Sequence, residues 1–466
     1  MDSSAITETG AVGIARQIRA GQITPTEAVE AAISRIEQVN PDLNAVVTTT
    51  FDSARREAAD ADYRITEQGA EGLPPLFGVP ITIKDCFPVK GARFTAGSWF
   101  HRDDVADHDA PAVTRLREAG AIILGKTNLP DMCWGFESVN PVFGRTESAR
   151  GAGYSAGGSS GGEAAIIAAG GSALGLGSDI GGSLRNPAAN NGCVSLKPST
   201  GRVPDDDHVP EVPDQLRPWN HAGPLARRVE DLALALGVLD GGGEVTLPDI
   251  EGVTCRVFTG NRSMLVSPEV KAAVKRAGAA LAQAGMRTEK SPSLPIQRMG
   301  VLYSNLLREY GMPEIELQLG GGQGFSWPAE MKRAIRGDAR ISAEALSVYG
   351  YIAYGGRLKP GPGDSLETLA RLRQQVFEAV GDGVLVCPLL LTRPLRHGAT
   401  WLPLAQIPMA VPFNMTGLPV VVLPAYWTAN GLPLAVQVVA GPGRDELALA
   451  TATALEDGLG GWRPVG

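Results

Sequence analysis

Hydrophobic residues are distributed along this chain in two patterns. One has the spacing of an amphipathic helix, and the other is a short, continuously apolar run. The helical pattern dominates the first part. A capping box at residues 24–27 (TPTE) opens a helix that Asn40-Pro41 is predicted to end. A β-type run at 46–49 and a charged amphipathic helix at 51–68 follow. We therefore expect residues 1–76 to form a helical collar that packs on the core.

The continuously apolar pattern predicts buried strands in the rest of the chain. Such runs lie at 76–84, 121–126, 384–386, 420–423 and 434–439. Helical patterns separate them, at 110–119, from Asn128 onwards, and at 228–239, 268–284 and 445–455. Strands that alternate with helices indicate an α/β fold.

The segment 286–382 interrupts this alternation with a weaker, irregular helical pattern. We therefore divide one large domain into the collar, a core half at 77–285, a cap-like insertion at 286–382, and returning core strands with a helix at 383–466. Aromatic residues gather in the insertion, where they fill its own core or form the wall of a substrate pocket. They are Tyr303, Tyr310, Phe325, Trp327, Tyr349, Tyr351 and Tyr354.

The composition argues against several classes of function. The 466 residues are 44% hydrophobic and 20% charged, with a net charge of −8 and no basic stripe, so nucleic acid is not an expected partner. No apolar run reaches membrane-spanning length, and the start MDSSAITETG does not resemble a signal peptide. Five cysteines without CxxC indicate a reduced cytoplasmic protein, and five histidines without ligand spacing predict no metal site. We expect no cofactor.

The richest chemical signal is the stretch 157–185. Ser159 stands in GGSSGGE and Ser183 in DIGGSLR, and the apolar run between them predicts a buried helix followed by a buried strand. Glycine-rich turns at the ends of core elements bring backbone N–H groups together, which suits an oxyanion or a phosphate. No G-K-[ST] follows the glycines, which disfavours a phosphate site.

A serine nucleophile needs a base within hydrogen-bond reach. The letters at 157–161 spell G-x-S-x-G, but a nucleophile elbow must follow a strand directly, and here a glycine-rich loop at 140–156 precedes it. This disfavours a Ser-His-Asp triad using the distant His397. Lys84, which closes an apolar strand, is the better candidate because burial favours an uncharged amine.

These motifs together resemble the amidase signature hydrolases, which use a Ser–cis-Ser–Lys triad. The resemblance rests on GVPITIKD, on GGSSGGEAA through DIGGSLR, on LKPSTGR, on AGPLARRVEDLA, and on PFNMTGLPV before GLPLAVQVV. It covers nearly the whole chain and is weakest at about 285–380. It implies a single α/β/α layered domain with a mixed central sheet.

The resemblance also implies roles for individual residues. Ser183 is the implied nucleophile, Ser159 the bridging serine on a cis peptide after Gly158, and Lys84 the base. The backbone N–H groups of Ile180, Gly181, Gly182 and Ser183 would form the oxyanion hole. The implied supporting residues are Ser160, Asp179 and Arg185, with the last two paired to hold the loop.

The expected activity is hydrolysis of a small-molecule amide through an acyl-enzyme. A carbamate (urethane) or ester hydrolase by the same mechanism is an alternative, and so is the glutamine-amidase subunit of a tRNA-dependent amidotransferase. Ser148-Ala149-Arg150 stands where the family often has N-P-W, which leaves the substrate open. We expect substrate choice to depend on residues 290–380 and the loop 140–155, with a preference for aryl or arylalkyl groups. A homodimer is one possible assembly.

Overall fold

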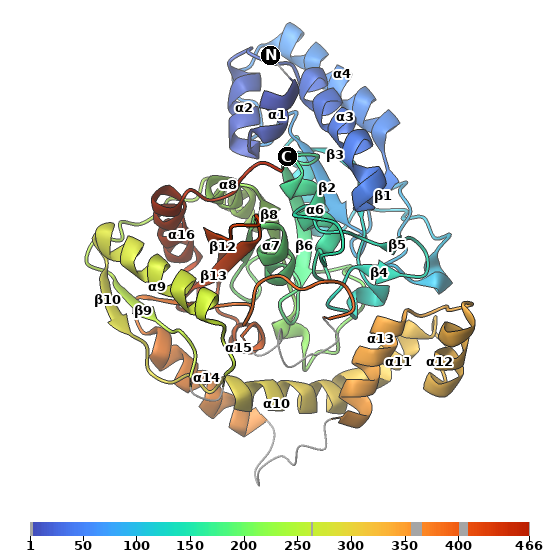
Figure 1. Ribbon diagram of the computed structural model, residues 1–466. Helices are drawn as coiled ribbons and strands as arrows, with labels where there is room; N and C mark the ends of the chain where they lie inside the picture. Colours follow the sequence, from blue (N-terminus) through green and yellow to red (C-terminus); the bar gives the residue numbers. More distant parts are fainter. Residues whose placement is uncertain (1–2, 262–263, 356–365, 400–408, 466) are drawn as a thin grey trace.

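The computed structural model describes residues 3–261, 264–355, 366–399 and 409–465. Its centre is an 11-stranded mixed sheet with the order β1-β3-β2-β6-β8-β7-β12-β13-β11-β9-β10 (Figure 1). Its strands are β1 (Val46–Thr49), β2 (Pro80–Lys84), β3 (Ile122–Thr127), β6 (Leu174–Asp179), β7 (Val194–Lys197), β8 (His221–Ala226), β9 (Thr254–Val257), β10 (Arg287–Lys290), β11 (Val384–Pro388), β12 (Val420–Trp427) and β13 (Pro433–Ala440). A separate hairpin pairs β4 (Val139–Asn140) with β5 (Gly144–Arg145). The α/β prediction is confirmed.

Helices pack on this sheet in two connected groups. Buried α6 (Gly161–Ala168) and α7 (Arg185–Asn191) contact each other, and α7 also lies on β7, β12 and β13. In the second group α8 (Val229–Asp240) and α9 (Pro268–Gln283) both contact α16 (Asp445–Leu459). Two further short helices in the described residues are α5 (Pro111–Glu118) and α15 (Val411–Thr416). All of α6 and α7 is buried, including polar side chains such as Glu163 in α6 and Arg185 in α7.

The N-terminal helices are α1 (Ser3–Glu8), α2 (Ala11–Arg19), α3 (Pro25–Leu43) and α4 (Phe51–Gln68), which Figure 1 shows in blue. The capping box forms as predicted, because Glu27 N donates to Thr24 Oγ1 and Thr24 N donates to Glu27 Oε2. The predicted helix end at Asn40-Pro41 is wrong. The helix continues to Leu43 because a proline in the last turn removes a single intrahelical bond, and Asn44, with φ 50°, closes the helix.

A second prediction fails at residue 128, where no long helix begins. Only a three-residue 3₁₀ turn forms, Asp131–Cys133, and both Met132 (φ 47°) and Cys133 (φ 63°) adopt left-handed backbone. The Asn128 side chain, which accepts from Leu129 N, favours this local turn over a helix.

The helices of residues 296–380 lie along the side of the molecule opposite α1–α4 (Figure 1). They are α10 (Ile296–Leu306), the π-helical turn Leu307–Gly311, α11 (Met312–Leu319), α12 (Trp327–Arg336), α13 (Ala343–Gly350), a second π-helical turn Tyr351–Gly355, and α14 (Leu366–Val380). Part of the predicted insertion, 356–365, lies outside the described residues. Among the helices that the structure describes, none combines the length and apolar character needed to cross a membrane.

Candidate active site

The site lies where two adjacent parallel strands end. In β2 and β6, Ile83 is paired with Leu176, so the carboxyl ends of both strands reach the same edge of the sheet. Lys84 is the last residue of β2, and Ser178 is next to last in β6. Both side chains are buried. The strand order therefore places a lysine amine beside a serine hydroxyl that is distant in sequence.

Lys84 contacts hydroxyl groups in this structure. Its Nζ lies 2.6 Å from Ser159 Oγ and 2.9 Å from Ser178 Oγ, and its side chain is fully buried. A second buried lysine on the next strand, Lys126, differs because its Nζ forms an ion pair with Asp85 Oδ1 at 2.7 Å. Lys84 forms no ion pair with any carboxylate among the described residues. The arrangement suits an amine that exchanges protons with a hydroxyl.

Ser159 follows a cis peptide bond with Gly158 and stands just before α6. Gly158 has no room for a side chain, because a Cβ there would lie 2.5 Å from the carbonyl oxygen of Gly135. Ser138 fixes the turn, since its Oγ donates to Gly157 O and accepts from Gly161 N, each at 3.0 Å. The glycines therefore let the chain bring Ser159 against Lys84.

Ser183 lies in the loop between β6 and α7, and this loop is wrapped around the Asp179 carboxylate. Asp179 accepts from Gly182 N at 2.7 Å and from Leu184 N at 3.1 Å. Ser160 N donates to Ser183 O at 3.1 Å, which ties the two Gly-Ser turns together. Ser183 is half-buried and shares with Ser159 the wall of one cavity.

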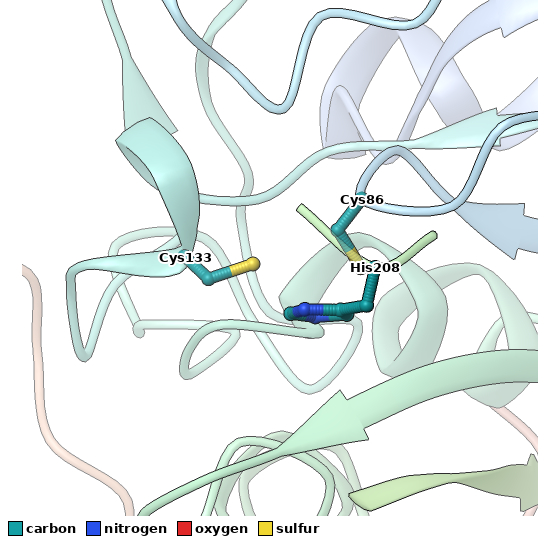
Figure 2. A group of neighbouring side chains, drawn as sticks. All are labelled: Cys86, Cys133 and His208. Carbon is teal, nitrogen blue, oxygen red and sulfur yellow. The ribbon is translucent and has the colours of Figure 1, made fainter. Parts of the chain in front are cut away.

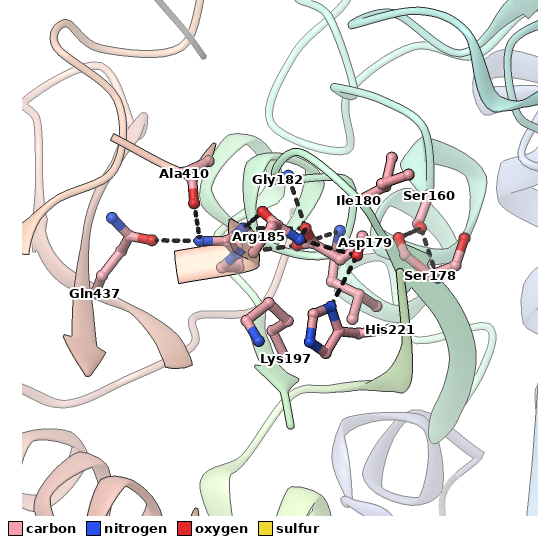
Figure 3. Close-up of polar contacts among 12 residues, drawn as sticks. Ser160, Ser178, Asp179, Ile180, Gly182, Arg185, Lys197, His221, Ala410 and Gln437 are labelled. Atoms are coloured by element: carbon pink, nitrogen blue, oxygen red, sulfur yellow. Dashed lines mark hydrogen bonds and ion pairs between the residues drawn. The ribbon is translucent and has the colours of Figure 1, made fainter. Parts of the chain in front are cut away.

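Arg185 holds the Asp179 carboxylate through two nitrogens, Nε at 2.9 Å and Nη2 at 3.0 Å (Figure 3). Both side chains are fully buried. Burial raises the pKa of Asp179, but the charge and hydrogen bonds of Arg185 and a hydrogen bond from Asn414 hold that pKa well below its usual range. Arg185 Nη1 also donates to Ala410 O and Gln437 Oε1, so the loop is tied to β13 and to the residue before α15.

The predicted oxyanion donors are not equivalent. The Gly182 N–H is directed at Asp179, as described above. Among the described residues, the N–H groups of Ile180, Gly181 and Ser183 have no such partner in the protein. The Ile180 carbonyl accepts from Tyr303 Oη at 3.2 Å, which orients the first peptide of the loop.

Ser159 and Ser183 open into a cavity of about 1030 Å³, counting the space at its mouth. Its wall is mostly apolar and comes from 132–136, 208–216, 303–318 and 348–352 together with the serine loops. Loop 140–155 does not line this cavity, so the cavity does not support that part of the specificity prediction. Loops 132–136 and 208–216 line it, and neither of them was identified from the sequence as part of the site.

The aromatic residues of the insertion divide between cavity and packing. Tyr303 and Tyr351 line the cavity. Trp327 packs on Tyr354 with ring centroids 6.0 Å apart, and Phe325 packs on Tyr349 at 4.9 Å. Different members of the cluster therefore line the cavity and pack against one another.

The histidines and cysteines are less scattered than their spacing suggests. Cys86, Cys133 and His208 come together, each from a different segment (Figure 2). His208 Nε2 and Cys86 Sγ also contact Ser178 Oγ, at 2.8 and 3.6 Å. His397 lies elsewhere and contacts Glu137 and Glu147, which does not support a Ser-His pair with Ser159.

Comparison with known proteins agrees with this geometry. The family model described as Amidase matches residues 27–316 and 363–449. The chain belongs to the amidase family. It is 36% identical to "Fatty-acid amide hydrolase 2-A" of Danio rerio over 98% of this chain and 90% of that protein. One subunit of the glutamyl-tRNA(Gln) amidotransferase of Koribacter versatilis is 32% identical over 95% of this chain and 96% of its own length.

Among solved structures, "Crystal structure of amidase" superposes with a TM-score of 0.80 at 28% identity, covering 97% of this chain and all of that one. The resemblance noted in the sequence is thereby confirmed. This amidase is an enzyme that hydrolyses amide C–N bonds.

Proposed function

We propose that this amidase hydrolyses a small apolar or aryl amide, with Ser183 as nucleophile, Ser159 as proton relay and Lys84 as base. The observation that carries the proposal is the 2.6 Å contact between Lys84 Nζ and Ser159 Oγ in a fully buried setting of hydroxyl partners. At this distance a proton can pass directly between the two groups, and the uncharged form of a lysine amine is the form that accepts it.

In the first half-reaction Lys84 takes a proton from Ser159, and Ser159 takes one from Ser183 as its Oγ attacks the substrate carbonyl carbon. The N–H groups of Ile180, Gly181 and Ser183 receive the developing oxyanion. The proton then returns through Ser159 to the leaving amine, which departs and leaves an ester on Ser183. Water attacks this ester by the same proton route and releases the acid.

The cavity supports an apolar or aryl substrate. Its wall carries few charges, and Tyr303 and Tyr351 both contribute aromatic surface to it. The relative named as a fatty-acid amide hydrolase agrees with an apolar acyl or amine group. Carbamates and esters pass through the same kind of Ser183 adduct, so a turnover screen of anilides, primary amides, carbamates and esters ranks these leaving groups.

Two experiments test the assigned roles. Intact-mass spectrometry after treatment with a fluorophosphonate should show one adduct on the wild type and none on Ser183→Ala. Lys84→Ala should lose several orders of magnitude in turnover, and Lys84→Arg should not restore it because a guanidinium stays protonated. Labelling of Ser183→Ala to the wild-type extent, or near-normal turnover by Lys84→Arg, contradicts the mechanism.

A second candidate is the glutamine-amidase subunit of a tRNA-dependent amidotransferase, which the Koribacter versatilis relative favours. Such a subunit delivers ammonia to a partner protein. The isolated chain separates the two functions: rapid turnover of anilides without glutamine hydrolysis supports the small-molecule amidase, and the reverse supports the amidotransferase role.

A further inference from the structure

A group of soft metal ligands lies directly beside the proposed proton relay. The sulfurs of Cys86 and Cys133 and a ring nitrogen of His208 all lie within 4.8 Å of one another. No other group of three or more His, Cys, Asp or Glu side chains with this spacing occurs in the part of the chain that the structure describes. Tetrahedral zinc, with bonds of about 2.0–2.3 Å, holds its ligand atoms roughly 3.5–3.8 Å apart. Side-chain shifts of about an ångström would therefore bring the three atoms onto one ion.

The His208 ring is oriented as a ligand would be. Its Nδ1 lies 3.2 Å from the carbonyl oxygen of Pro210, a contact in which Nδ1 must carry the hydrogen. In the neutral ring Nε2 then carries the lone pair, and it lies 2.8 Å from Ser178 Oγ, which itself lies 3.6 Å from Cys86 Sγ. A carbonyl that fixes the far ring nitrogen is the usual support of a metal-binding histidine. The Phe87 ring packs edge-on at 5.2 Å and limits rotation of the imidazole.

The backbone connects the three segments. Val209 N donates to Cys86 O at 2.9 Å, and Cys133 Sγ lies 3.7 Å from Val209 O. The segments carrying Cys86 and Cys133 are thereby both held against the loop that carries His208. In Figure 2 the Cys133 sulfur points across the gap toward the other two side chains. The cluster is held in place by its surroundings.

An ion could reach this position from the substrate cavity. Cys133, His208, Ser178 and Ser159 all line that cavity, whereas Cys86 is fully buried behind it. Two thiolates and one imidazole suit zinc and similar thiophilic ions and do not suit magnesium or calcium. Zinc held by three protein ligands keeps a fourth coordination position, which a water molecule would take.

We propose that Cys86, Cys133 and His208 form a binding site for Zn²⁺ that inhibits the amidase reversibly. On binding, both thiols release their protons to solvent and His208 Nε2 exchanges its contact with Ser178 for the metal. Ser178 is also a partner of Lys84, at 2.9 Å. The ion and its water would then occupy the cavity wall beside Ser159, and Ser178 would lose its contacts with His208 and with Cys86, whose Sγ lies 3.6 Å from Ser178 Oγ. Both effects oppose catalysis.

Binding is tested without reference to activity. Reduced, metal-free wild-type enzyme is titrated with Co²⁺, and a thiolate-to-cobalt charge-transfer band is expected to saturate at one ion per chain. Zn²⁺ should abolish the band by displacement, and Mg²⁺ should not. Cys133→Ser is expected to bind Zn²⁺ at least about 100-fold more weakly, whereas Cys255→Ser, a change at a buried cysteine on β9, should bind as the wild type does.

Inhibition is then measured on an anilide substrate against each variant's own metal-free rate. Stoichiometric Zn²⁺ should suppress turnover of the wild type and of Cys255→Ser, EDTA should restore it, and Cys133→Ser should resist. Absence of the charge-transfer band in the wild type overturns the site, whether or not any variant folds. Equal inhibition of Cys133→Ser overturns it as well, and binding without inhibition overturns the inhibitory role. If the enzyme hydrolyses none of the substrates tested, the cobalt titration still decides the site.

Discussion

Arg185 donates hydrogen bonds from Nε and Nη2 to the Asp179 carboxylate, at 2.9 and 3.0 Å. These two residues stand at the two ends of the loop that carries Ser183. The same carboxylate accepts the N–H groups of Gly182 and Leu184 from within the loop. Because both charges are fully buried, each depends on the other for compensation. The pair therefore fixes the backbone that carries Ser183, the proposed nucleophile, and the N–H groups proposed as oxyanion donors.

Arg185→Lys is expected to reduce kcat/KM on the order of 100-fold, because an ammonium cannot match both carboxylate oxygens and the loop shifts. It should also destabilise the fold by about 3 kcal/mol, within the range for a broken buried pair. Steady-state kinetics and urea unfolding measure the two effects. The control is Arg256→Lys, at a partly exposed pair with Glu289, which should leave both quantities nearly unchanged. Normal kinetics in Arg185→Lys would contradict a positioning role.

Ser178 offers a second prediction because it joins Lys84 and His208. Ser178→Ala should lower kcat on the order of tenfold or more with little change in KM, since a buried amine loses one of its two hydroxyl partners. The matched control is Ser195→Ala, since Ser195 Oγ is buried and has no hydrogen-bond partner among the described residues. That variant should be neutral or slightly more stable. Equal effects of the two substitutions would argue that Ser178 has no special role.

Tyr351 is predicted to set preference for aromatic substrates. Tyr351→Ala should lower kcat/KM for an anilide on the order of tenfold relative to a short aliphatic amide, since it removes aromatic surface from the cavity wall. Tyr354→Ala is the control, because Tyr354 is 66% exposed and does not line the cavity. Trp327→Ala should instead lower the melting temperature, because the Trp327 ring packs on Tyr354 and its Nε1 donates to Leu346 O. An unchanged preference ratio in folded Tyr351→Ala would exclude this residue as a determinant.

The buried carboxyl of Glu163 is expected to make the stability of the folded protein depend on pH. Burial raises the pKa of its carboxyl to about 8, although hydrogen bonds from Thr82 and Thr127 lower it. The unfolded chain gives up this proton near pH 4.5, so the folded state holds one more proton between about pH 4.5 and 8. The stabilisation that this proton gives the folded state is full below pH 4.5 and is lost as the pH rises through 8.

Glu163→Gln removes this titration while keeping the shape of the side chain. The unfolding free energy of the variant minus that of the wild type should rise by on the order of 3 kcal/mol between pH 5 and pH 8.5. Urea unfolding at several pH values measures it, with Glu289→Gln, at a half-exposed position, as control. A difference that is constant with pH would contradict a protonated Glu163.

The sequence by itself determined the α/β class, the capping box of α3 and the local context of Lys84, Ser159 and Ser183. These features depend on nearest neighbours along the chain: apolar runs that must be buried, glycines that permit tight turns, and a lysine that ends an apolar strand. The same local signals failed at Asn128, where a side-chain hydrogen bond favoured a turn, and at Pro41, where the position in the last turn mattered more than the residue type.

Only the tertiary structure decided which distant segments meet. The pairing of β2 with β6 places Ser178 against Lys84, and loops from separate regions bring Cys133 and His208 to Cys86. The cavity wall likewise comes from 132–136 and 208–216 and not from 140–155. Strand order and loop packing follow from burial summed over the whole sheet, so no short window of sequence contains them.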